Sequence, residues 1–201
     1  MAETVALIDY GAGNLHSVHN ALRVAGAGRI EIAATPEAVA AADRIVLPGV
    51  GAFGAAMDRL RAIPGMIETL DARARAAARP FLGVCVGMQL MAASGEEHGD
   101  TPGLGWLPGR VAALPAGAVK VPHMGWNDVR PVAPHPVIAA GEAYFLHGFA
   151  YAGPGVLAET DHGGPLAAAI GQDNLIGVQF HPEKSQRYGL SLLARFLEWR
   201  P

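Results

Sequence analysis

Cysteine is almost absent from this chain of 201 residues, in which Cys85 is the only one. A single cysteine excludes an internal disulfide and a zinc site of the CxxC kind. Chains without disulfides are typical of reducing compartments, so we expect a cytoplasmic protein. The first residues, MAETVALIDYG, lack a positively charged start and carry Glu3 and Asp9, which does not fit a secretory signal peptide.

Charge and long hydrophobic runs are also scarce. Charged residues make up 16% of the chain, the formal net charge is −3 and no basic run occurs, so we expect no nucleic-acid partner. The longest uncharged apolar stretch, Phe81 to Ser94, is shorter than the ~20 residues of a membrane span, so we expect no membrane partner. No spacing such as HExxH indicates a metal site, and we expect no cofactor. A hydrophobic content of 51% is typical of a globular chain.

The first half of the chain alternates strand-like runs with helical ones. The expected strands are Thr4–Asp9, Arg29–Ala34, Arg44–Pro48 and Pro80–Val84. The expected helices are Asn14–Ala25, a short one from Pro36 after the cap Thr35, Ala55–Ala78 with a break at Pro64-Gly65, and Val86–Ala93. This alternation predicts βαβ units, and hence an α/β fold with an open, mostly parallel sheet flanked by helices.

The second half, from Gly103 to Val178, is rich in glycine and proline and contains short strand-like runs. These are GRVAAL, AYFLHGF, GVLAET and NLIGVQF. They predict hairpins and antiparallel additions to the same sheet. A helix is expected to close the chain at Gln186–Trp199, with an apolar stripe of Leu190, Leu193, Ala194 and Leu197. No repeat or long linker interrupts the sequence, so we predict one domain over residues 1–201.

Cys85 lies between two glycines in FLGVCVGMQL, where a predicted strand runs into a predicted helix. This is the pattern of a nucleophile elbow, with cysteine in place of serine. Gly83 and Gly87 would let the strand and the helix approach closely. Free amides at the start of a helix favour a thiolate. The alternative is a small buried hydrophobic residue, which is the usual role of a free cysteine.

His181 is the best candidate for the base that a cysteine nucleophile needs. It directly follows a predicted strand in GVQFHPEKS, and Glu183 lies two residues further on. Because Pro182 disfavours a helix, we expect an extended segment in which both side chains point to the same side. The glutamate would then fix the tautomer of the ring. A surface HPE turn is the alternative.

A glycine-rich turn follows the third predicted strand. Gly49, Gly51 and Gly54 match GxGxxG, which taken alone indicates dinucleotide binding. Pro48 breaks the usual lead-in, however, and no second strand with an acidic end follows at the expected distance. The other interpretation is that this turn brings backbone amides close to Cys85 as half of an oxyanion hole, and the amide of Val86 supplies the other half.

Five segments in chain order make the sequence resemble the class I glutamine amidotransferases, which have a flavodoxin-like fold. Within that family it resembles the glutaminase subunits of imidazole glycerol phosphate synthase. The segments are DYGAGNLHSV, LPGVGAFG, GVCVGMQLM, KVPHMGWN and FHPEKSQ. GxCxG and HPE mark the larger family, whereas DYGAGN together with PHMGWN is more specific. The family often has His-Ser-Tyr where this chain has His147-Gly148-Phe149, so only a backbone contact is expected there.

The resemblance implies that the chain hydrolyses glutamine to glutamate and ammonia. It implies a heterodimer with a (β/α)8-barrel cyclase subunit, which uses the ammonia to make imidazole glycerol phosphate and aminoimidazole carboxamide ribotide in histidine biosynthesis. The implied catalytic residues are Cys85 as nucleophile, His181 as base and acid, and Glu183 as orienter. The other implied residues are Val50 and Val86 for the oxyanion; Gly51, Gln89, Gly148 and Phe149 for glutamine; and Asn14, His123, Met124, Trp126, Asn127 and Lys184 for the partner.

Two other functions remain open at this point. One is a free-standing cysteine hydrolase of the same fold, and the other is a non-catalytic binding module in which Cys85 is merely packed. The HPE segment argues against the binding module. PHMGWN argues against the free-standing hydrolase, because Met124 and Trp126 show no core periodicity and so indicate an interface.

Overall fold

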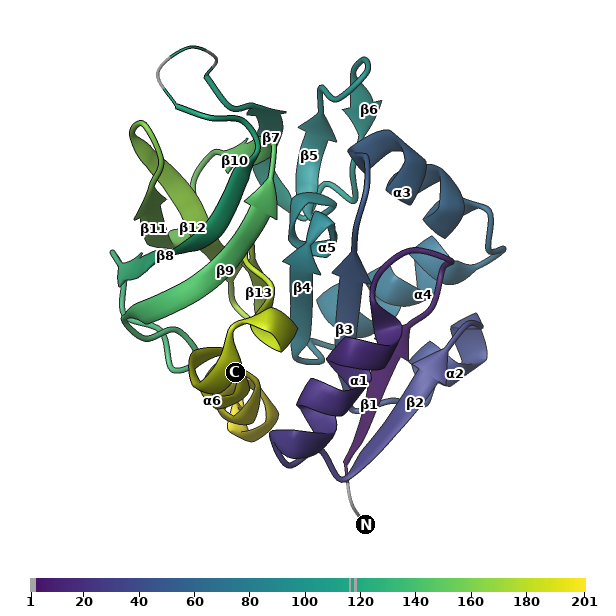
Figure 1. The fold of residues 1–201 in the computed structure, drawn as a ribbon. Coiled ribbons are helices and arrows are strands. Elements are labelled where there is room, and N and C mark those ends of the chain that lie inside the picture. Colours follow the sequence, from purple (N-terminus) through teal and green to yellow (C-terminus); the bar gives the residue numbers. More distant parts are fainter. Residues whose placement is uncertain (1–2, 116, 118) are drawn as a thin grey trace.

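A nine-stranded sheet forms the centre of the protein, in the order β2-β1-β3-β4-β13-β12-β11-β8-β9 (Figure 1). The computed structural model describes residues 3–115, 117 and 119–201. Neighbouring strands run parallel from β2 to β13 and antiparallel from β13 to β9. In sheet order the strands are Arg29–Ala33, Thr4–Ile8, Arg44–Gly49, Phe81–Cys85, Leu175–Val178, Pro165–Gln172, Val156–Asp161, His123–Pro131 and Gly141–His147. The α/β fold with a parallel first part and antiparallel additions is confirmed.

A separate four-stranded sheet, in the order β10-β7-β5-β6, stands beside the large one. Its strands are Phe149–Ala152, Leu107–Ala113, Ala92–Gly95 and Thr101–Pro102. The prediction that every strand of the second half joins one sheet is therefore wrong. GRVAAL belongs to β7, and AYFLHGF is divided between β9 and β10 at Gly148.

The helix expected at Val86–Ala93 is shorter than predicted. Helix α5 covers only Val86–Gln89, and Ala92 already begins β5. The carbonyl of Met91 accepts the amides of Trp106 and Leu107 at 3.0 and 2.9 Å. Pairing with a distant segment therefore uses backbone groups that a longer helix would need, and local sequence does not record that pairing.

The remaining helices cover the two faces of the parallel part. They are α1 (Leu15–Val24), α2 (Pro36–Ala40), α3 (Phe53–Arg61), α4 (Met66–Leu70), the π-helical turn η1 (Asp71–Ala76) and α6 (Gln186–Glu198). Helix α1 packs against α6, and α2 packs against α4 (Figure 1). The break at Pro64-Gly65 is confirmed. None of the helices in the described residues is both long and apolar enough to span a membrane.

The buried face of α6 differs from the predicted stripe. The buried residues are Gly189, Leu192, Leu193 and Phe196, whereas Leu190, Ala194 and Leu197 are only partly buried. The helix contacts α1 on one side and β9 on the other, so the buried face is set by two neighbours. Only Leu193 of the predicted stripe lies at the centre of that face.

The central strands β3 and β4 are buried along their whole length. Parallel strands of this kind are covered on both faces. Their register aligns Gly49 with Cys85, and the register of β4 with β13 aligns Val84 with Val178. The carboxyl ends of β3, β4 and β13 therefore meet at one edge of the sheet, and the packed core fixes their relative positions.

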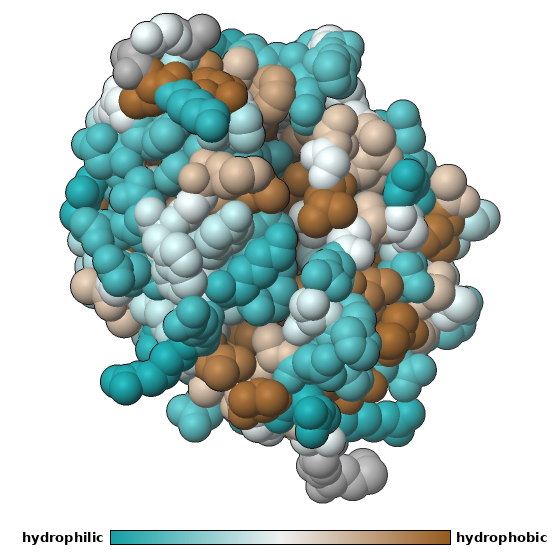
Figure 2. All heavy atoms as spheres, viewed as in Figure 1, coloured by the Kyte–Doolittle hydropathy of each residue, from teal (hydrophilic) through white to brown (hydrophobic). Residues whose placement is uncertain are grey.

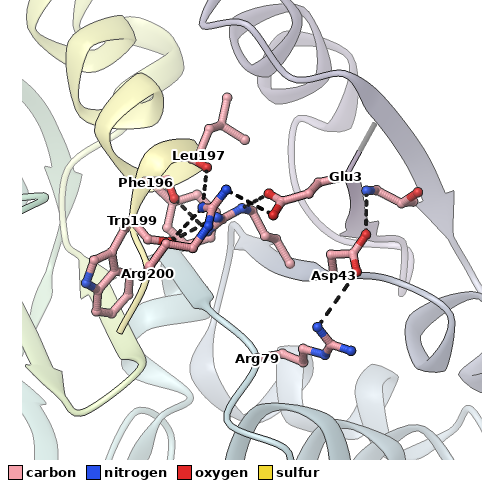
Figure 3. Close-up of polar contacts among 9 residues, drawn as sticks. Glu3, Asp43, Arg79, Phe196, Leu197, Trp199 and Arg200 are labelled. Atoms are coloured by element: carbon pink, nitrogen blue, oxygen red, sulfur yellow. Dashed lines mark hydrogen bonds and ion pairs between the residues drawn. The ribbon is translucent and has the colours of Figure 1, made fainter. Parts of the chain in front are cut away.

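Arg44, at the start of β3, connects both ends of the chain at the opposite edge. Its side chain is buried, and its Nε donates to Glu3 Oε2 at 2.9 Å. Its two terminal nitrogens donate to the carbonyls of Phe196 and Trp199, both at 2.9 Å (Figure 3). The last carbonyls of a helix have no helical partner, and Arg44 supplies charged donors to two carbonyls at the end of α6.

We predict that Arg44→Met lowers the free energy of unfolding by about 2–4 kcal/mol, because two carbonyls at the end of α6 each lose a charged donor and Glu3 loses its buried partner. Urea denaturation followed by circular dichroism measures the change. The matched control is Arg29→Met, which removes an exposed ion pair with Glu31 and should cost at most about 1 kcal/mol. Equal losses in the two variants would contradict this account of Arg44.

Candidate active site

Cys85 occupies the turn between β4 and α5, as the elbow pattern predicts. Its φ of 54° and ψ of −113° lie outside the regions that residues with a β-carbon prefer. A β-carbon on Gly83 would lie 2.6 Å from the carbonyl oxygen of Gly87, and one on Gly87 would collide with the carbonyl of Leu47. The two glycines are therefore required by backbone packing. Strain of this kind is concentrated at functional sites.

His181 and Glu183 form a buried pair next to this turn. His181 lies three residues beyond the end of β13, and its Nδ1 is 2.9 Å from Glu183 Oε1. The two side chains are only 4% and 2% exposed. The predicted contact is confirmed, but the predicted extended segment is wrong: Pro182–Lys184 forms a 3-10 turn after the extended His181. The turn places the carboxylate against the ring, and proline is well tolerated in the first turn of a helix.

The electrostatics of the site favour a charged His181. Burial lowers its pKa, but the interactions with Cys85 and Glu183 outweigh burial and raise the pKa to about 9. Because Glu183 engages Nδ1, the other ring nitrogen is left for the thiol. A protonated imidazole beside a cysteine stabilises the thiolate, which is the nucleophilic form. The pair can therefore activate the Cys85 sulfur as a nucleophile.

Cys85 and His181 line a common cavity of about 150 Å³. Its lining residues are Val50, Gly51, Cys85, Val86, Gln89, Glu97, Leu146, His147, Gly148, Phe149, His181 and Lys184. Both predicted oxyanion residues and all predicted glutamine residues are among them. A larger hollow of about 610 Å³, lined in part by Asp71, Trp106 and Asn174, opens near the start of β13, and no cysteine or histidine is among its lining residues.

The two predicted oxyanion residues reach the cavity from different elements. Val86 opens α5, where the first amides of a helix have no helical partner. Val50 follows β3 and is 45% exposed, and the next residue, Gly51, has a positive φ of 90°. The glycine turn after β3 thus lies at the cavity. Whether these amides serve an oxyanion stays a prediction.

Gln179 is a site residue that the sequence reasoning missed. Its side chain is fully buried, its Nε2 donates to Cys85 Sγ at 3.8 Å, and its Oε1 accepts from Gln89 Nε2 at 3.0 Å. Gln89 Nε2 also donates to the Phe149 carbonyl at 3.1 Å. Both amide hydrogens of Gln89 are thereby engaged, so only its oxygen remains for a ligand. The sequence signal that could have found Gln179 is its polar side chain in the otherwise apolar run from Leu175 to Phe180.

Glu97 is a second residue that was missed. It lines the cavity, and its Oε2 accepts the amide of Phe53 at the start of α3 at 2.8 Å. A carboxylate at this position provides the cavity with a negative charge that can attract an ammonium group. The local sequence GEEHGD gives no signal for this placement, because Glu96 and Glu97 are equivalent in it.

The predicted partner residues differ in their exposure to solvent. Met124 and Trp126 are 62% and 48% exposed and point to the same side of β8, and the exposed Lys184 lies over the ring of Tyr144. Figure 2 shows apolar residues on this view as separate small areas among hydrophilic ones. His123, by contrast, is buried.

His123 is buried, and its assignment to the partner interface stays a prediction. It is enclosed because it stacks on the ring of Phe145 on one side and on that of His162 on the other. Asn127 donates to the His123 ring and to the Asp161 carbonyl. Asn14 is exposed and caps α1 through the amide of Ser17.

Comparison with known proteins gives the same family throughout the chain. A model of the family described as "Glutamine amidotransferase class-I" matches residues 6–199. The chain is 54% identical to the imidazole glycerol phosphate synthase subunit HisH of Zymomonas mobilis, over 100% of this chain and 98% of that protein. It is 50% identical to the subunit of the same name from Rhodospirillum rubrum, over 98% and 99% of the two chains. A crystal structure described as a glutamine amidotransferase has a TM-score of 0.75 at 20% identity, over 96% and 97% of the two chains, and shares the fold.

We predict that the pKa of His181, near 9 in the wild type, falls in Glu183→Gln, because the amide lacks the charge that favours the protonated ring. Titration of labelled imidazoles by NMR measures this. The stability that the raised pKa contributes is full below the usual value of 6.5 and is lost as the pH rises through about 9. His135, whose pKa is lowered by burial, is the control and should not move. An unchanged pKa of His181 in the variant would contradict the assignment.

Proposed function

The chain belongs to the class-I glutamine amidotransferase family, and from that premise we propose that it is the glutaminase subunit of imidazole glycerol phosphate synthase. It hydrolyses glutamine to glutamate and ammonia, and passes the ammonia to a cyclase subunit in histidine biosynthesis. The observation that carries the proposal is the cavity that Cys85 and His181 share, in a chain similar over its full length to HisH subunits. Release of glutamate from glutamine, measured with and without the cyclase, tests it.

The reaction begins with attack of the Cys85 sulfur on the side-chain carboxamide carbon of glutamine. The protonated His181 gives its proton to the departing nitrogen, which leaves as ammonia, and a thioester remains on Cys85. A water molecule then attacks the thioester carbon while His181 takes a proton from it. Collapse of that intermediate releases glutamate and restores the thiolate. Glu183 orients the ring and stabilises its charge in both steps.

The cavity walls supply the remaining interactions. The backbone amides of Val50 and Val86 stabilise the oxyanion of each tetrahedral intermediate, and one such donor contributes about 3–4 kcal/mol. Glu97 attracts the α-ammonium group of glutamine, and the side-chain oxygen of Gln89 accepts a hydrogen bond from it or from the carboxamide. Gly51, Gly148 and Phe149 contribute backbone contacts from both sides of the cavity.

The partner in this proposal is a (β/α)8-barrel cyclase that forms a heterodimer with the chain. Met124, Trp126 and Lys184 are exposed, and Lys184 also lines the cavity from which ammonia must leave. Exposed large apolar side chains are typical of an interface, which favours a partner over a free-standing hydrolase. The strained, cavity-lining position of Cys85 argues against a merely packed thiol.

We predict that Cys85→Ala reduces glutamine-dependent turnover by at least about 1,000-fold, because no other group in the site can form the thioester. Alanine keeps the backbone conformation of cysteine, so the fold is preserved. In complex with the cyclase, the variant should still support the synthase reaction when ammonium is supplied, which is the internal control. Near-normal glutaminase activity in the variant would end the assignment of Cys85 as nucleophile.

We predict that Lys184→Ala weakens binding of the cyclase or its stimulation of the glutaminase, while the activity without the partner changes little. A charge that loses its water on docking contributes more than an exposed one. Titration of the cyclase into wild type and variant measures both affinity and rate. The matched control is Arg29→Ala, which removes an exposed charge at the start of β2, far from the cavity. If Lys184→Ala behaves like this control, Lys184 lies outside the interface.

A further inference from the structure

A chain of polar contacts links strands β8 and β9, where His123 and His147 are cross-strand partners. His123 Nδ1 lies 3.1 Å from His147 Nε2, and His147 Nδ1 lies 2.9 Å from the carbonyl oxygen of Phe149. On the other side, His123 Nε2 lies 3.0 Å from Asn127 Nδ2, which also donates to the carbonyl of Asp161 at 2.8 Å. This series of hydrogen bonds therefore ends at a backbone carbonyl on each side, that of Phe149 and that of Asp161.

The two carbonyls fix the direction of every hydrogen bond between them, because a carbonyl only accepts. His147 must carry its proton on Nδ1 to donate to Phe149, which leaves its Nε2 as an acceptor. His123 must then donate from Nδ1, and its Nε2 accepts from Asn127. Both rings are thus neutral, with the same tautomer. A second proton on either ring would place two donors against each other.

The surroundings keep both rings neutral. Burial lowers the pKa of His147 to about 4, assisted by the charges of His123, His162 and His181 and opposed by the bond to the Phe149 carbonyl. Burial and the charge of His162 likewise lower the pKa of His123 to about 4. Both rings are therefore neutral near pH 7, and the mechanism above moves no proton through them.

The Phe149 carbonyl connects this pair to the nucleophile. It accepts from Gln89 as well as from His147; Gln89 also donates to Gln179, and Gln179 donates to Cys85 Sγ. The smaller sheet holds the backbone on either side of this carbonyl, since Phe149–Ala152 pairs with β7 and the Gly148 carbonyl accepts the amide of Leu114 at 3.0 Å. The Phe149 carbonyl itself accepts from the side chains of His147 and Gln89.

We propose that His123 and His147 are positioning residues of the glutamine site, which hold the Phe149 carbonyl where it orients Gln89 and, through Gln179, the sulfur of Cys85. The inference rests on the proposed function, since it concerns how that site receives glutamine. His147 acts directly on the carbonyl, and His123 acts by fixing the tautomer of His147. Loss of the pair leaves Gln89 alone to bond the Phe149 carbonyl, and it removes no group that reacts.

The test is a matched pair of variants, His147→Leu and His147→Asn, assayed in complex with the cyclase. Leucine and asparagine are similar in size, but only the asparagine amide can donate from the place of Nδ1. We expect His147→Leu to lower kcat/KM for glutamine about tenfold, mainly through a higher KM, as loss of a buried hydrogen bond does. His147→Asn should stay within about threefold of wild type, and the ammonium-driven reaction should be unchanged in both.

The corresponding leucine and asparagine variants of His123 separate a loss of positioning from a loss of folding. His123→Leu should raise KM in the same direction as His147→Leu, and His123→Asn should restore it; thermal unfolding reports the folded fraction of each variant. Equal kcat/KM in the leucine and asparagine variants would overturn the inference, as would leucine variants at both positions that fail to fold while the asparagine variants fold. A wild-type complex without glutaminase activity would instead refute the proposed function, and this inference with it.

Discussion

The close contact between the end of β4 and the first turn of α5 is the constraint on which the site depends. Gly83 and Gly87 have no room for a β-carbon, and Cys85 between them is held at a positive φ. The fully buried β3 and β4 resist relaxation of that turn. The cysteine sulfur is therefore presented at the sheet edge at a conformational cost that the core sustains.

The site contains the buried pair of His181 and Glu183, and beside it lies the buried pair of His123 and His147. The electrostatics of the two pairs are opposite. His181 lies beside a carboxylate and a thiol, and its pKa rises to about 9. His123 and His147 lie beside each other and backbone carbonyls, and burial lowers their pKa values to about 4. The first pair can hold and move a proton near neutral pH, whereas the second can only donate and accept fixed hydrogen bonds. The different partners of these rings thus separate the residue that moves a proton from the residues that hold fixed hydrogen bonds.

The two halves of the chain supply different parts of this arrangement. The parallel half brings Cys85 and the glycine turn after β3 to one edge, as the carboxyl ends of parallel strands do. The antiparallel half supplies the opposite wall through β9 and β10, with Gly148 where the chain passes between sheets. Because β8 pairs along the length of β9, the strand that presents Met124 and Trp126 is also bonded to the strand that lines the cavity.

The sequence by itself determined the alternating first half, the elbow around Cys85 and the pairing of His181 with Glu183, because these depend on glycines, a proline and spacings that act locally. It did not determine the end of α5 at Gln89, the second sheet or the buried face of α6, because distant strands and helices decide them. The tertiary structure alone brought Glu97 to the cavity, placed Gln179 against Cys85 and enclosed His123. Hydrogen bonds such as those from Gln89 to Gln179, 90 residues apart, leave no periodic trace in a sequence. Burial, which lowers the pKa values of His123 and His147, exists only once the whole chain has packed.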